Sequence, residues 1–218
     1  MARPISGLMT LIAALAAGCA GQVGGEPYVP DHPPSEMRTV TVWVQDSPGL
    51  LHNAAVLGCD IWYPEGVRCD ITADERYADV RVYGHDTPCV VRSDGTFTLA
   101  TAFGDHTIVF ETQCMGKLPD GTLDPHMFRT VMGHEMGHQL GVWAHVPETC
   151  DEPHVTHPTG GPVCGQALMN PMYDANIDFM TALDHLAFEM RDRDASVLEG
   201  GSPGISGGDP ICVFTGSL

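Results

Sequence analysis

Three residues in the stretch "VMGHEMGHQLGVWAH", 131–145, have the types and the spacing for metal chemistry. His134 and His138 are four positions apart, so on a helix their imidazoles share one face. Neutral imidazole is a good zinc ligand. Glu135 follows the first histidine directly, so its carboxylate can take a proton from a zinc-bound water without binding the metal. The pattern predicts a zinc site with Glu135 as general base.

A hydrolytic zinc site usually has a third protein ligand beside the water. Gly141 ends the predicted helix, because glycine can take the positive φ that turns the chain. His145 is the first histidine after that turn and is the predicted third ligand, with His154 and His157 as alternatives. A glutamate ligand would normally come from a following helix, whereas the composition of residues 146–166 predicts a loop.

The complete pattern resembles that of the metzincin metallopeptidases, and of their matrixin type in particular. The family pattern is H-E-x-x-H-x-x-G-x-x-H followed by a methionine turn. Here "HEMGHQLGVWAH" places three residues, instead of two, between Gly141 and His145. Downstream, "ALMNPMY", 167–173, is similar to the matrixin sequence A-L-M-x-P-x-Y. The resemblance covers about residues 38–195.

The resemblance implies a zinc-dependent endopeptidase with one catalytic Zn²⁺. It implies that Met169 is the turn methionine beneath the zinc, and that Pro171 and Tyr173 line the pocket for the substrate residue after the cleaved bond. It also implies that an exposed edge strand, Phe97–Phe103, pairs with an extended peptide substrate. An internal position for this strand is the alternative.

Matrixins often hold a second zinc and calcium in the strand region. His85, Asp86 and His106 lie in that region here, but they do not make a complete ligand set. Surface histidines are therefore the preferred interpretation, and a Ca²⁺ site is possible but unsupported.

The additional residue before His145 leaves open whether the predicted site is catalytically active. In strict register Ala144 would face the zinc, and the chain would be a catalytically impaired, zinc-bearing binding domain displayed on the cell envelope. The segment after Gly141 is irregular, however, so a residue adding about 3.3 Å of reach can be absorbed as a bulge. Glu135 favours the peptidase, because a binding domain has no need of a carboxylate there. Hydrolysis of a non-peptide amide is a third interpretation.

The elements that must position the site are predicted from periodicity and capping signals. Strands are expected at 37–44, 66–72, 78–84, 95–104 and 106–111. Helices are expected at 48–62 with Ser47 as cap, from Asp124 and Pro125 to Leu140, and at 181–193 with Thr181 and Asp184 as capping box. The predicted fold class is α+β, of the α/β metzincin type. It is a twisted mixed sheet with an edge substrate strand, a backing helix, an active-site helix and a C-terminal helix after the methionine turn.

The N-terminal segment predicts export and a lipid anchor. "MAR" is followed by the apolar "PISGLMTLIAALAAG", which is too short for a stable transmembrane anchor. It ends in "LAAGC", which resembles a bacterial lipobox with Cys19 as the lipidated residue; an ordinary signal peptide is the alternative. The predicted organisation is a signal peptide, 1–18, a lipid-anchored Gly/Pro-rich tether, 19–37, a catalytic domain, 38–195, and a flexible tail, 196–218.

The charge excludes some partners. Twenty-eight acidic residues against 10 basic ones give a net charge of −18, which argues against nucleic acid as a partner. We expect a peptide or protein substrate, a membrane contact through the lipid, and a monomer. The expected location is the bacterial cell envelope, as a lipoprotein, or the medium after secretion.

Eight cysteines suit an exported, disulfide-bonded protein. If Cys19 carries lipid, nearest-neighbour spacing predicts the pairs Cys59–Cys69, Cys89–Cys114 and Cys150–Cys164 and leaves Cys212. Sequence alone permits other pairings. A zinc–thiolate cluster is disfavoured because the chain has no C-x-x-C pair.

Overall fold

The structure is a computed structural model that describes residues 26–45, 49–120, 124–142, 145–146, 166–170, 173–174, 176–197 and 210–217. For 190–197 and 210–217 the description concerns the backbone.

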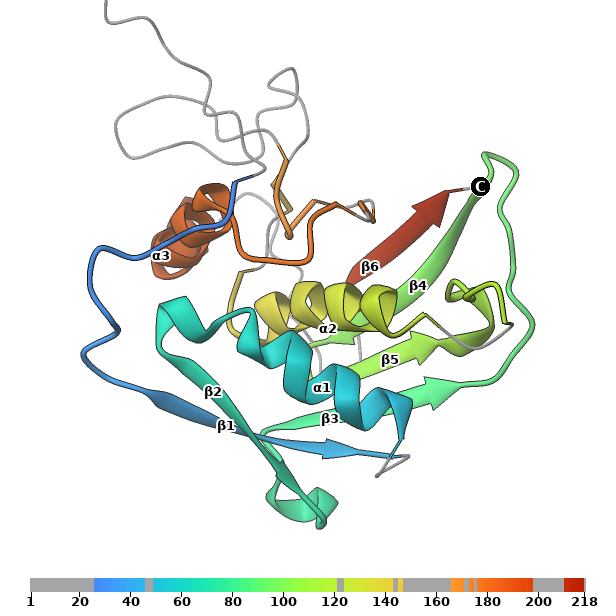
Figure 1. Ribbon diagram of the computed structural model, residues 1–218, viewed down its shortest axis with the longest axis horizontal. Helices are drawn as coiled ribbons and strands as arrows, with labels where there is room; N and C mark the ends of the chain where they lie inside the picture. Colours follow the sequence, from blue (N-terminus) through green and yellow to red (C-terminus); the bar gives the residue numbers. More distant parts are fainter. Residues whose placement is uncertain are drawn as a thin grey trace, which may run out of the picture.

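A mixed sheet forms one layer of the molecule, with strands in the order β2-β1-β3-β5-β4-β6 (Figure 1). The strands are β1 (Arg38–Val44), β2 (Val67–Thr72), β3 (Val80–His85), β4 (Thr96–Phe103), β5 (Thr107–Glu111) and β6 (Pro210–Ser217). Strands β2, β1, β3 and β5 are parallel, whereas β4 runs antiparallel to both β5 and β6. In β1, the alternate residues Val40, Val42 and Val44 are buried, as expected for a strand with one face on the core.

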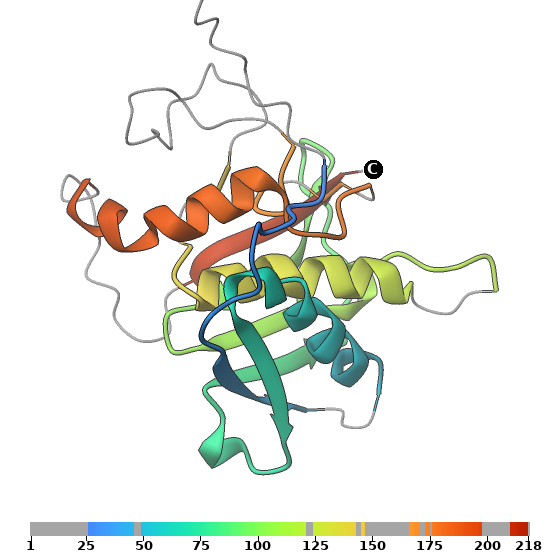
Figure 2. The same cartoon turned by 60° about the vertical axis from the view of Figure 1, so that its left-hand side comes forward.

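Helices α1 (Leu50–Asp60) and α2 (Pro125–Gln139) cover one face of the sheet, and α3 (Ala182–Val197) lies apart from them (Figures 1 and 2). Short 3₁₀ turns occur at Tyr63–Glu65, Glu75–Tyr77 and Thr112–Cys114. Helices α1 and α2 cross in close contact, since a Cβ on Gly58 would lie 2.6 Å from the Cβ of Met132. Most side chains of α2 are therefore buried.

Most of the predicted elements are present within a few residues of their expected positions. Helix α1 begins later than predicted, because its N-cap is Gly49, which makes no side-chain cap hydrogen bond. Ser47 and Pro48, which were predicted to start it, lie outside the described residues. Helix α3 continues to Val197 instead of ending at 193.

Two predictions need correction. Residues 210–217 were predicted to belong to a flexible tail, but they form β6 and pair with β4. Strand β4 is therefore internal and not the edge strand that was predicted for substrate binding. The physical reason is that "PICVFTGS" contains β-branched and aromatic residues that favour a strand, and an uncovered edge offers it unpaired backbone groups.

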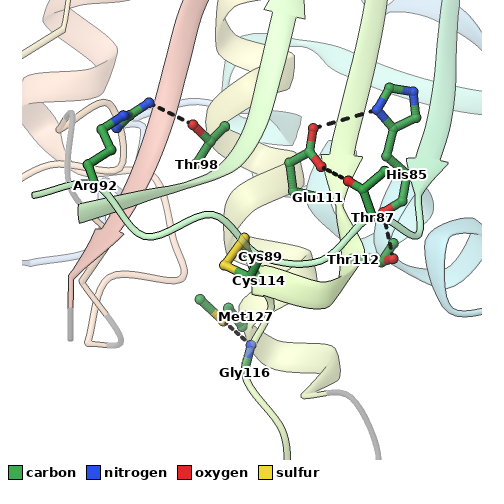
Figure 3. The surroundings of a disulfide bond; sticks show 10 residues. All are labelled: His85, Thr87, Cys89, Arg92, Thr98, Glu111, Thr112, Cys114, Gly116 and Met127. Atoms are coloured by element: carbon green, nitrogen blue, oxygen red, sulfur yellow. Dashed lines mark hydrogen bonds and ion pairs between the residues drawn. A yellow bond between two sulfur atoms is a disulfide. The ribbon is translucent and has the colours of Figure 1, made fainter. Parts of the chain in front are cut away.

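Two predicted disulfides are confirmed. Cys59–Cys69 joins α1 to β2, and Cys89–Cys114 joins the segment after β3 to the turn after β5. Figure 3 shows that Arg92, near this second disulfide, donates to Thr98 of β4 at 2.9 Å. Cys150 and Cys164 lie outside the described residues.

In the part of the chain that the structure describes, no helix combines the length and the apolarity that crossing a bilayer requires.

Candidate metal centre

Helix α2 begins and ends as its sequence dictates. The Asp124 carboxylate accepts a hydrogen bond from the backbone N–H of His126 at 2.9 Å, and Pro125 occupies the first turn. The last turn closes at Leu140, and Gly141 has a φ of 100°. Only glycine takes that conformation without strain. The chain therefore leaves the helix in a fixed direction immediately after the second histidine.

Three imidazoles converge at this helix end. His134 and His138 come from α2, and His145 comes from the segment after the turn. The Nε2 atom of His134 lies 3.1 Å from that of His138 and 3.2 Å from that of His145. All three ligand atoms lie within 4.8 Å of one another. The predicted triad is thus assembled, and the additional residue before His145 does not prevent it.

The hydrogen bonds of the two helix histidines define their tautomers. The Nδ1–H of His134 donates to the carbonyl of Leu168 at 2.8 Å, and the Nδ1–H of His138 donates to the carbonyl of Val142 at 2.6 Å. A carbonyl can only accept, so both Nε2 atoms are unprotonated and direct lone pairs at each other. Such an arrangement is repulsive unless a cation lies between the nitrogens.

The spacing of these nitrogens fits a small metal ion. Two nitrogens bound tetrahedrally at 2.0–2.1 Å lie about 3.3 Å apart. The distances from His134 to its two neighbours are close to that value. These histidines therefore have the donor chemistry and the geometry to hold a metal ion.

Burial keeps the triad neutral. Desolvation, followed by the mutual influence of the imidazoles, lowers the pKa of His138 to about 3 and that of His134 well below its ordinary value. Desolvation lowers the pKa of His145 to about 4. All three rings are neutral at pH 7, which is the state that binds a metal.

Glu135 has a different environment from its neighbours. Its side chain is fully buried, and neither carboxylate oxygen has a hydrogen-bond partner among the described residues. Desolvation raises its pKa well above the ordinary value. The backbone N–H of Ala102 in β4 acts in the opposite direction and lowers this pKa, but it does not form a hydrogen bond with the Glu135 carboxylate. An orphaned buried carboxylate is costly, so its presence indicates a partner in the working site.

Met169, the predicted turn methionine, is buried and packs against α2 next to the second histidine. A Cβ on Gly137 would lie 2.5 Å from the Met169 sulfur, so the methionine packs directly against α2. The Met169 carbonyl accepts from the N–H of Val146 at 2.9 Å, and the Asn170 side chain donates to the Val146 carbonyl at 2.6 Å. These two bonds anchor the residue that follows His145. Sequence reasoning missed the role of Asn170. The feature that could have indicated it is that Asn170 is polar, whereas the residues before it in this turn are apolar.

Asp184 supports the same turn from α3. Its fully buried carboxylate accepts from the N–H groups of Leu168 at 2.9 Å and of Met169 at 2.8 Å. It also accepts from the backbone N–H and the hydroxyl of Thr181, both at 2.8 Å, which confirms the predicted capping box. Burial nevertheless raises its pKa. Because Leu168 in turn accepts from His134, Asp184 orients that imidazole indirectly, a role that the sequence reasoning missed.

The predicted pocket residues are described only in part. Tyr173 is half-buried, and its pKa is raised to about 12 by desolvation and by the nearby carboxylates of Asp124, Asp174 and Asp178. Its role in a substrate pocket stays a prediction. Pro171, Cys19, His154 and His157 lie outside the described residues.

The suggested second metal region is occupied by separate polar pairs. His85 lies 3.6 Å from Glu111 (Figure 3), and His106 contacts Gln139 at 3.2 Å. Asp86 accepts a hydrogen bond from Gln113. Within the described ranges, the histidine triad is the one group of three or more such ligands that lie together.

Comparison of the chain with protein-family models and with curated proteins finds no match.

Proposed function

We propose that this chain is a zinc-dependent endopeptidase of metzincin type, in which Glu135 is the general base. One observation carries the proposal: three neutral imidazoles converge beside a buried carboxylate that is not one of them and has no hydrogen-bond partner. The resemblance of "HEMGHQLGVWAH" and "ALMNPMY" to the metzincin motifs supports it. So does the packing of Met169 against α2 next to His138.

The donor set favours zinc over other ions. Three histidines with an open fourth position are typical of catalytic zinc, whereas calcium and magnesium prefer oxygen ligands. Bound zinc would supply Lewis-acid activation of a water molecule and of the scissile carbonyl. The Leu168 and Val142 carbonyls would keep two of the ligands in the correct tautomer and orientation.

Glu135 has the properties that proton transfer requires. It lies one residue from the first ligand, and its raised pKa brings the carboxyl closer to neutral pH. In the proposed reaction it accepts a proton from the attacking water at a carboxylate oxygen. It then donates that proton to the nitrogen of the leaving amine, which returns the carboxylate to its starting state.

The substrate is proposed to be an extended peptide that takes the place of β6 beside β4, because both sides of β4 are paired in the structure. Extended peptides commonly bind by adding a strand to a sheet, where backbone hydrogen bonds supply affinity. Strand β4 packs against α2, which carries Glu135, so a peptide along β4 would lie beside the helix of the general base. This arrangement favours peptide bonds over other amides.

A proteolysis assay tests the proposal. Purified zinc-loaded protein should cleave unfolded proteins, a chelator should abolish cleavage, and added zinc, but not magnesium, should restore it. The assay should include the chain shortened to residues 1–209, because β6 pairs with the proposed substrate strand. Zinc-loaded protein that cleaves nothing in either form would favour a zinc-bearing binding domain.

Export and lipidation belong to the same proposal. The sequence "LAAGC" supports Cys19 as the lipidated residue. A Cys19→Ser variant should lose the acyl mass and move from the membrane fraction to the soluble fraction. Unchanged fractionation would contradict the lipid anchor.

A further inference from the structure

Strand β6 pairs with the side of β4 that faces away from β5. The pairing is antiparallel and runs from Thr96 opposite Ser217 to Phe103 opposite Pro210. Figure 1 shows β6 at the end of the sheet, with the rest of the sheet on one side of it. The last described segment of the chain therefore covers the backbone groups to which an extended peptide would bind.

The pairing of β6 is less regular than that of the other strands. Its register shifts between Thr98 and Ala100 and again between Ala102 and Phe103. The registers of β1 with β2 and of β3 with β5 have no such shift. Strand β6 is paired on one side only, as β2 is, and the interruptions of its ladder favour local opening of the pairing. These features are expected of an exchangeable occupant.

The position of β6 relative to the general base makes this pairing relevant to function. Ala102 is opposite Cys212 in the register, and β4, which carries Ala102, packs against α2. Strand β6 also approaches α2, which carries Glu135. The segment thus passes beside the proposed reaction site, where Glu135 is fully buried.

The composition of residues 210–217 suits such an occupant. "PICVFTGS" contains no charged residue, although the whole chain has a net charge of −18. Ile211, Val213 and Phe214 have a high preference for extended backbone. The segment therefore has the chemistry of a peptide ligand for a strand edge.

We propose that residues 210–217 are an intramolecular occupant of the peptide-binding side of β4, so that substrate gains access only when β6 leaves. The inference rests on the proposed function, because it assigns the regulation of that site. It predicts a latent enzyme that is activated when the C-terminal strand is removed or displaced by a partner. It also predicts that preferred substrates are extended and uncharged around the cleaved bond, as β6 is.

The expected size of the effect follows from tethering. A segment in the same chain has an effective concentration on the order of 1 mM. If the free segment binds with a Kd of about 10–100 μM, tethering leaves roughly one molecule in 10 to one in 100 open. Releasing β6 should therefore raise kcat/KM for a peptide about 10-fold to 100-fold.

The first experiment measures hydrolysis by the full chain, by the chain 1–209, and by a full-length variant with Val213→Pro and Phe214→Pro. Successive N–H groups of a strand point to opposite sides, so one of these two prolines removes a donor directed at β4. Both altered forms should be activated. A control with Val213→Thr and Phe214→Tyr keeps both donors and should remain within about twofold of the full chain. Equal rates for all forms would overturn the inference and leave the endopeptidase proposal standing.

The second experiment does not depend on catalysis. In zinc-loaded Glu135→Gln protein, the probe is a fluorescent peptide of residues 210–217 carrying Cys212→Ser, and binding is measured by anisotropy. The chain 1–209 should bind the probe at least about tenfold more tightly than the full chain. This result would support occupancy by β6 even if no form hydrolysed peptides, in which case the proposed function alone would fail. Equal affinity would overturn the inference.

Hydrogen exchange covers the case in which the shortened chain does not fold. If β6 is an exchangeable occupant, β4 amides that face it should exchange at least about tenfold faster in the full chain than β1 amides, by local opening. If those β4 amides exchange as slowly as β1 amides, β6 is a permanent strand and the inference is overturned.

Discussion

The two sides of the histidine cluster differ in how completely their polar groups are paired. On the side of the methionine turn, Leu168 accepts from a ligand, and Asp184 accepts from the turn. On the side of β4, both oxygens of Glu135 lack a partner among the described residues. Strand β4 is also where the pairing register is interrupted.

This difference corresponds to two tasks, holding a metal ion and transferring a proton. Groups that hold a metal gain from fixed orientation, because every partner they have reduces their freedom before the ion binds. A group that must take a proton and pass it on needs room for water and substrate. The paired side therefore matches a role in metal binding, and the unpaired side matches a role in chemistry.

The largest effect should come from the ligands. His134→Ala combined with His138→Ala should abolish retention of zinc, whereas the unaltered chain should retain about one zinc after dialysis. His145→Ala should lower zinc affinity on the order of 100-fold or more, since the loss of groups that merely support a ligand costs up to that amount. Metal analysis and competition with a chelator dye provide the measurements.

His126→Ala is the matched control on the same helix, because His126 contacts Asp178 at 3.0 Å and is not part of the triad. It should keep its zinc. Full zinc retention by the double variant would remove the metal assignment. Full retention by His145→Ala would redirect the search to His154 and His157.

The second effect should appear at Glu135 and should separate chemistry from metal binding. Glu135→Gln should keep the zinc and lower kcat about 10²-fold to 10⁴-fold, because the general base is lost. It should also raise the unfolding temperature of the metal-free protein at neutral pH, because a buried ionisable group without a partner is replaced by a neutral one.

Glu111→Gln is the control for this change. Glu111 is the last residue of β5, accepts a hydrogen bond from Thr87 (Figure 3), and is not part of the histidine triad. It should leave hydrolysis unchanged. If Glu135→Gln hydrolysed peptides at the original rate, another residue would have to accept the proton.

The third effect tests the support from α3. The Asp184 carboxylate accepts four hydrogen bonds with its two oxygens. The variant Asp184→Asn keeps only one acceptor oxygen, so some of these donors lose their partner. Each buried backbone donor left unpaired should cost about 1–3 kcal/mol of unfolding free energy. Because Leu168 orients His134, zinc affinity should fall about 10-fold to 100-fold. Urea denaturation and zinc titration would measure the two quantities.

Asp178→Asn is the comparison, because Asp178 is partly exposed and pairs with Arg129 at 2.8 Å. It should cost less than about 1 kcal/mol and leave zinc affinity unchanged. If Asp184→Asn bound zinc as tightly as the unaltered chain, the methionine turn would not need this support to hold its ligand.

Local patterns predicted the paired side of the site well. The cap at Asp124, the spacing of His134 and His138, and the turn at Gly141 all depend on neighbouring residues, and the structure confirms them. The Cys59–Cys69 pair was predicted for the same reason, since its members are 10 residues apart.

Two contacts between distant segments were not predicted, although the Cys89–Cys114 pair, 25 residues apart, was. Asp184 reaches Leu168 across 16 residues, and its capping pattern accounts for only part of its bonds. Strand β6 pairs with β4 across more than 100 residues, and the Gly-rich stretch before it resembles a tail. Periodicity describes how a segment folds by itself, but the partner of a strand edge is decided by which segment reaches it in the folded chain.

The smallest effect concerns the additional residue between Gly141 and His145. Deleting Ala144 would restore the two-residue spacing of the metzincin pattern while keeping His145. The two ends of this segment are held independently. Val142 is fixed by its bonds to Gly137 and His138, and Val146 is fixed by its bonds to the methionine turn.

Because both ends are anchored, a shorter connection should alter the path between them more than the position of the ligand. We therefore expect the deletion to leave a folded chain that binds zinc within about tenfold of the original affinity, well short of the loss expected for a missing ligand. Peptide hydrolysis should persist in the form 1–209. If only the deletion variant hydrolysed peptides, the additional residue would have impaired the original site, and the chain as it stands would be a zinc-bearing binding domain. Loss of zinc on deletion would show instead that the longer connection is what allows His145 to reach the cluster.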